Sequence, residues 1–138
     1  MRTRLRNERG TALLETAITL PIILLVSVAI FEFGRAYQVQ QVLTNAAREG
    51  ARIAVLPGVS DADVTARVRQ YLSDGGLVAV DPVVERNVPF GSTTASRVTI
   101  NFPFSFIVLN PVARLVVATS GAGDGPITMR AVAMMRNE

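Results

Sequence analysis

A glycine followed by a lone glutamate, at the start of a long apolar run, is the arrangement in this chain that indicates chemistry. Residues 9–15 read RGTALLE, so Gly10 ends a short basic segment and Glu15 is the fifth residue after it. A carboxylate inside a bilayer is costly unless an opposite charge pairs with it or it lies near the interface. Glu15 therefore needs a positive partner or an interfacial position.

Side chains suited to catalysis or metal binding are scarce. The 138 residues include no histidine and no cysteine, so the usual zinc ligands and the usual general base are missing. Asp61 and Asp63 would suit a metal or an acid pair, but their position after Ser60 favours the first turn of a helix. We expect no enzyme, no cofactor, no bound metal and no small-molecule substrate.

The positive charge is concentrated at the N-terminus. The net charge is +3, and residues 1–10 alone carry +3, from four arginines and one glutamate. By the positive-inside rule this end stays in the cytoplasm and the C-terminal part crosses the membrane. Because no basic patch continues beyond residue 9, we expect no nucleic-acid partner.

One long helix is expected to position these residues. Residues 11–33 would span roughly 34 Å as a helix, against about 30 Å of hydrocarbon. Residues 34–56 continue with helical periodicity and a polar face, so the helix projects beyond the bilayer. Glu32 and Arg35, three residues apart, are predicted to pair at the membrane exit, and Tyr37 to anchor at the interface.

Small side chains recur along the projecting part of the helix and would let another element approach closely. They are either the seam on which the chain's own C-terminal sheet packs or a surface between subunits, and both can hold. The residues concerned are Ala46, Ala47, Gly50, Ala51 and Ala54.

Residues 57–138 are predicted to form a small α+β domain. Ser60 caps a helix that closes at residues 74–76. From residue 77 the sequence favours β structure, with two apolar runs within 77–88 and a last strand over 127–135. Such a domain lacks disulfides, so packing on the outer half of the long helix is expected to supply much of its core.

Three features refine this domain. Large apolar residues alternate from Val98 to Phe106 and predict one core face of a strand, in which Pro103 indicates an edge or a bulge. Asn110, followed by Pro111, predicts the start of a short helix. The cluster GAGDGP, residues 121–126, predicts a turn. The fold class is therefore α+β, a long N-terminal transmembrane helix with one domain helix and three to four antiparallel strands.

Three motifs follow Gly10 and Glu15 along the helix: the pair LP at 20–21, the exit EFGR at 32–35 and the block NAAREGAR at 45–52. The local arrangement of Gly10 and Glu15 resembles the cleavage signal of type IV prepilins and pseudopilins. Together, the motifs along residues 9 to about 54 resemble the TadE-like family of the tight-adherence (Tad, or Flp) pilus system. The remaining residues match only in general character.

The resemblance implies that a prepilin peptidase cuts after Gly10, so that residues 1–10 are a leader and Thr11 becomes the N-terminus. The cut frees a positive amine about one helical turn from Glu15 and removes the +3 cluster. The implied role of Glu15 is to meet such an N-terminus, its own or a neighbour's, as a subunit docks.

Two other interpretations of the N-terminus compete with this one. A secretory signal peptide would be cut after a small residue such as Ala29, but that site lies within the apolar run rather than after it. A plain signal anchor would make Gly10 and Glu15 incidental. The corresponding alternative function is an anchored binding or adhesion module of the envelope that never assembles.

The function predicted from the sequence is a non-catalytic pseudopilin or minor pilin-like subunit that assists Tad pilus assembly and surface adhesion. Its expected partners are a prepilin peptidase, other pilins and pseudopilins, the inner-membrane assembly platform and the lipid bilayer. Its expected location is the bacterial inner membrane, crossed once, with the N-terminus cytoplasmic and the domain periplasmic or extracellular.

Overall fold

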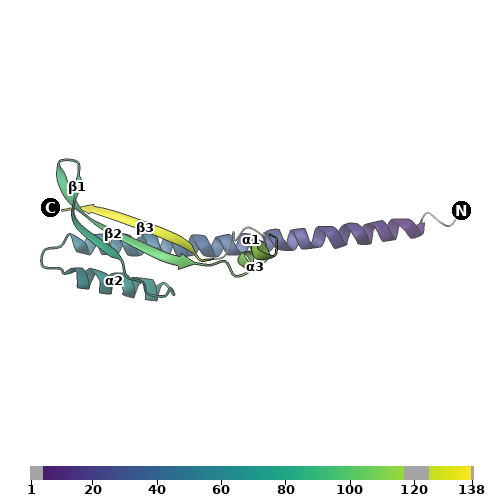
Figure 1. Ribbon diagram of the computed structural model, residues 1–138, viewed down its shortest axis with the longest axis horizontal. Helices are drawn as coiled ribbons and strands as arrows, with labels where there is room; N and C mark the ends of the chain where they lie inside the picture. Colours follow the sequence, from purple (N-terminus) through teal and green to yellow (C-terminus); the bar gives the residue numbers. More distant parts are fainter. Residues whose placement is uncertain (1–4, 117–124, 138) are drawn as a thin grey trace.

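One uninterrupted helix organises the molecule. In the computed structural model, which describes residues 5–116 and 125–137, helix α1 extends over Leu5–Ala54. Figure 1 shows α1 as a rod: the sheet and α2 lie along its C-terminal half, α3 lies near its middle, and the rest of its N-terminal half is bare. The helix begins at Leu5, earlier than the predicted start at residue 11, because the basic segment is rich in good helix formers. The division into a leader, a helix and a domain stays a prediction.

Helix α2, Asp61–Asp74, begins and ends as its sequence predicts. The hydroxyl of Ser60 accepts the backbone N–H of Asp63, and the Asp63 carboxylate accepts the Ser60 N–H at 2.9 Å, which together form a capping box. The N–H of Gly75 closes the last turn. The prediction that Asp61 and Asp63 are helix-start residues is therefore confirmed.

The sheet has three antiparallel strands in the order β1-β2-β3: Val83–Phe90, Thr93–Phe104 and Ile127–Arg136. This confirms the predicted α+β class and the predicted last strand. The first apolar run, residues 77–80, is not a strand. The N–H of Leu77 instead donates to the Leu72 carbonyl, and the run packs beside the core as a connection between α2 and β1.

Strand β2 confirms the predicted alternation as far as Phe104, where the strand ends; Phe106 lies beyond it. Its core face is buried at Val98, Ile100, Phe102 and Phe104. Strand β1 pairs with β2 only as far as Thr99, whereas β3 pairs with β2 to its end. A proline at position 103 therefore lies where β2 has one neighbouring strand, which is where a missing N–H is tolerated.

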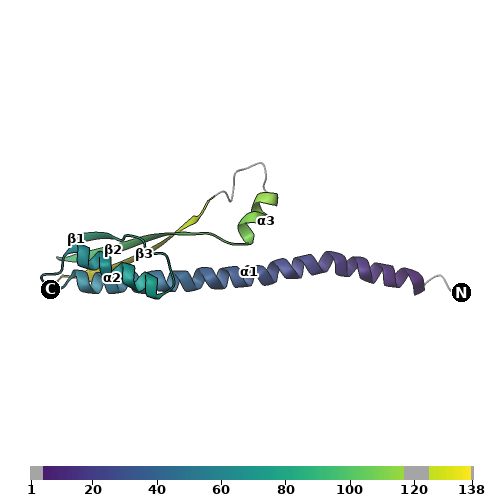
Figure 2. The ribbon, with the colours of Figure 1, turned by 90° about the horizontal axis from the view of Figure 1, so that it is seen from below.

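The core lies between the C-terminal half of α1, helix α2 and one face of the sheet, which Figure 2 shows from below. Helix α1 contributes more buried apolar residues than any other element, which confirms that the projecting part of the long helix supplies much of the core. These residues are Val39, Leu43, Ala46, Ala47, Ala51 and Ala54.

A third helix, α3, extends over Leu109–Val116. It begins at Leu109, whereas the sequence predicts Asn110 as the cap and Pro111 as the first helical residue. The N–H of Val112 donates to the Val108 carbonyl at 3.2 Å, so Pro111 lies in the first turn, where its missing N–H removes no helical bond. Most of the predicted turn cluster, residues 121–124, lies outside the described residues.

Candidate functional site

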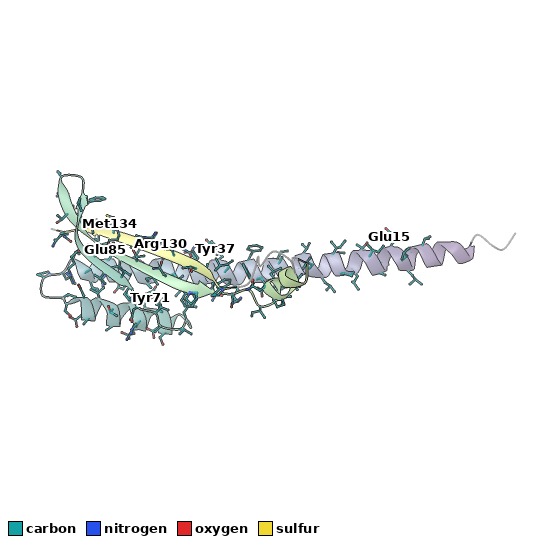
Figure 3. All side chains as sticks on the ribbon, in the orientation of Figure 1. Glu15, Tyr37, Tyr71, Glu85, Arg130 and Met134 are labelled. Atoms are coloured by element: carbon teal, nitrogen blue, oxygen red, sulfur yellow. The ribbon has the colours of Figure 1, made fainter. Side chains whose placement is uncertain are left out.

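Gly10, Thr11 and Glu15 lie on the exposed surface of α1. A Cβ atom built at Gly10 would meet nothing within 4 Å, so packing within the described part of the chain gives no reason for a glycine there. Figure 3 shows Glu15 on the bare half of the rod, far from the folded domain. Glu15 and the site of Gly10 are therefore open to contact with something other than the domain.

The bare half of α1 has the properties of a membrane span. Helix α1 is the one described helix that is long and apolar enough to cross a bilayer, and its most apolar stretch, in the bare half, is not buried by the domain. The hydroxyls of Thr16 and Ser27 donate to carbonyls four residues earlier, at 2.9 and 2.8 Å. This pairing satisfies both hydroxyl donors without water, as a lipid environment requires.

Glu32 marks the point where the domain first touches the long helix. Glu32 is only 6% exposed, and its Oε2 atom accepts a hydrogen bond from the backbone N–H of Ile107 at 2.8 Å. The Arg35 Nη2 atom is 3.8 Å from the same oxygen, so the predicted pair is present but long. The hydrogen bond to Ile107 is the closer contact, and it ties the segment after β2 to the membrane exit.

Arg35 and three phenylalanines complete this junction. The Arg35 guanidinium donates to the carbonyl of Ser105 and lies 4.5 Å from the centre of the Phe104 ring. The Phe106 ring packs edge to face on both Phe104 and Phe33, with centroids 5.2 and 5.6 Å apart. We call Glu32, Arg35, Phe104, Phe106 and Ile107 the exit cluster.

Tyr37 lies just beyond the exit cluster and is 68% exposed (Figure 3). An exposed phenol at this level suits an anchor in the lipid headgroup region.

The small residues of α1 lie in a seam within the chain. Ala46, Ala47, Ala51 and Ala54 are at most 1% exposed. A Cβ atom at Gly50 would lie 2.6 Å from the Val68 Cγ2 atom of α2 and 3.2 Å from the Val98 Cγ1 atom of β2. A glycine is thus required where three elements meet, and packing of the chain's own domain accounts for the whole set.

Charged residues beside the seam link α1 to α2. The Glu49 carboxylate accepts from Arg52 at 2.9 Å and from Arg67 of α2 at 3.2 Å. The hydrogen bond from Arg52, with that from Arg67, lowers the pKa of Glu49 to about 2 against the opposing effect of burial. The contact with Arg67 joins residues 18 positions apart and so connects the two helices.

Arg86, at the bulge of β1, is a second connection that sequence reasoning missed. Its guanidinium pairs with Asp61 at 2.6 Å and donates to the carbonyls of Ala54 and Val59 at 2.7 and 2.8 Å. It therefore binds the C-terminal end of α1, the following loop and the start of α2. A basic residue within a strand sequence is the only local signal of this role.

Fold and site together define a protein with one long apolar helix, which suits a single-pass membrane anchor, and a small α+β domain built on the same helix. The family model for TadE-like protein matches residues 10–52, so the resemblance predicted from the sequence is confirmed over that segment. The matched residues lie within α1, so the match concerns the long helix and not the domain built on it. No curated protein and no solved structure matches the chain.

Proposed function

We propose that the protein is a non-catalytic pseudopilin or minor pilin-like subunit that assists assembly of the Tad pilus and surface adhesion. The observation that carries the proposal is the division of α1 into two halves. The domain of the same chain packs on the C-terminal half. The N-terminal half is apolar and uncovered, and Gly10 and Glu15 lie exposed on it. The family match covers both residues.

In this function the uncovered half of α1 spans the inner membrane, with the leader in the cytoplasm and the domain in the periplasm. A prepilin peptidase cuts between Gly10 and Thr11. The cut leaves an amine about 6 Å along the helix axis from Glu15, since each residue rises about 1.5 Å. Glu15 then meets that amine, or the amine of a neighbouring pilin, which offsets the cost of a carboxylate in lipid and sets the axial register.

Mass spectrometry of the mature N-terminus tests the cleavage. The protein purified from its native membrane is expected to begin at Thr11, and a Gly10→Val variant to retain Met1. Gly34→Val is the matched control, because a Cβ at Gly34 also meets nothing within 4 Å in the same helix. An intact Met1 in the unmodified protein would refute the proposed pilin-like function and favour a plain signal anchor.

A Glu15→Ala variant tests the docking role. It is expected to be processed and inserted normally but to lose pilus assembly and surface adhesion. Leu14→Ala is the control, because Leu14 is a 62% exposed neighbour on the same bare half. Assembly and adhesion at unmodified levels in Glu15→Ala would show that this carboxylate has no part in docking.

A further inference from the structure

An apolar surface surrounds the membrane exit on the side of the domain. It consists of Phe31 and Phe33 on α1 and of Ile107 and Val108 just before α3. Their residues are 78%, 60%, 67% and 40% exposed, respectively. Four large apolar residues gathered at one level of a molecule indicate a contact surface rather than scattered exposure. We call these four residues the apolar rim.

The level of this rim along α1 is fixed by a specific contact. The Ile107 N–H is bonded to the buried Glu32 carboxylate, one residue from both Phe31 and Phe33. Figures 1 and 2 agree that α3 lies beyond the end of the sheet, at a level along the long axis that the uncovered half of α1 also occupies. Ile107 and Val108 are thus held beside the last residues of the span.

Helix α3 itself has the composition of an element that lies on a membrane. Its sequence, LNPVARLV, is apolar except at Asn110 and Arg114. In the described part of the chain, the extensive contacts between elements join α1, α2 and the strands, and α3 takes part in none of them. Helices with one polar side and one apolar side bind in the plane of the bilayer interface.

We propose that the rim residues Ile107 and Val108, together with α3, insert into the interface of the membrane leaflet that faces the domain. The occupant is lipid because the rim adjoins the uncovered apolar surface of the span, which the bilayer surrounds. The domain is thereby seated on the bilayer at two points, α1 and α3, instead of standing on α1 alone. This inference rests on insertion of the span but not on pilus assembly.

Site-directed spin labelling tests the inference, because the chain has no cysteine of its own. The full-length protein is reconstituted at one copy per nanodisc of phosphatidylethanolamine and phosphatidylglycerol, and a nitroxide is attached to Ile107→Cys. Val83→Cys on β1 is the matched control, since Val83 is 52% exposed at a site away from the exit. Leu25→Cys is the reference within the span.

The Ile107 label is expected to collide preferentially with oxygen, as the Leu25 label does, and to lose collisions with a water-soluble nickel chelate. The Val83 label is expected to show the reverse. If Ile107 behaves like Val83 while Leu25 lies in lipid, the inference is overturned and the proposed function is untouched. If Leu25 is also open to the chelate, insertion and the inference fail together. Protection of Ile107 only at two copies per disc would assign the rim to a second subunit instead.

Discussion

Replacing Glu32 by alanine should detach the segment after β2 from α1 without unfolding the domain. The change removes a buried carboxylate that accepts the Ile107 N–H at 2.8 Å. A hydrogen bond to a charged group contributes about 1.5–3 kcal/mol, and the long pair with Arg35 adds a few tenths. We therefore expect the local opening free energy to fall by about 2 kcal/mol. Arg35 retains its contacts with the Ser105 carbonyl and the Phe104 ring.

Hydrogen exchange in nanodiscs measures this opening directly. A loss of about 2 kcal/mol corresponds to exchange at the Ile107 amide that is roughly 30-fold faster, since 1.4 kcal/mol is a factor of ten. Glu32→Gln keeps an acceptor oxygen but not the charge, so its effect should be about half in free energy. Gln38→Ala, an exposed change on the same helix, is the control. Unchanged exchange at Ile107 in a folded Glu32→Ala protein would refute the assignment of Glu32 as the tie.

Three further changes test the junctions of the domain by urea unfolding. Gly50→Ala should destabilise by about 1–2 kcal/mol because its Cβ collides with Val68, whereas Gly34→Ala should be neutral or stabilising; equal effects would refute the packing argument. The folded pKa of Glu49, about 2, lies below its usual 4.5, so its contribution is complete above pH 4.5 and is lost as the pH falls towards 2. Because the arginine partners of Glu49 are about half exposed, we expect the free energy of unfolding to fall by about 1 kcal/mol over that pH window. This fall should be absent in Glu49→Gln, and an identical pH profile in that variant would contradict the assignment to Glu49. Arg86→Lys should cost about 2 kcal/mol, since one ammonium cannot serve three separated acceptors, and full stability in that variant would exclude the proposed connection.

The elements that the sequence predicts well are those whose signal is local. Ser60 and the aspartates after it specify a capping box within four residues, and the alternation from Val98 to Phe104 requires only a pleated strand with one buried face. The apolar run of α1 is equally local. Its beginning was misplaced because the residues before Gly10 are polar but still favour a helix.

The contacts that hold the site were not predictable, because they join residues far apart in the chain. Glu32 and Ile107 are 75 positions apart, and Arg86 reaches back 32 positions to Ala54. Periodicity shows which face of an element is buried but not which backbone group a buried carboxylate will accept. Residues 77–80 show the converse error, in which an apolar run packs against the core without joining the sheet.

Because no linker separates the span from the domain, a tilt of the span moves the domain with it. Helix α1 passes from the exit cluster into the core without a break, so the domain must follow the orientation of the span. The distance from Arg35 to Ala54 is roughly 29 Å along the axis, since each residue rises about 1.5 Å. A span tilt of about 20°, which is typical for membrane helices, displaces the far end of the domain sideways by about 10 Å. The tilt of the span is thereby converted into the position of the surface that the domain offers to its neighbours.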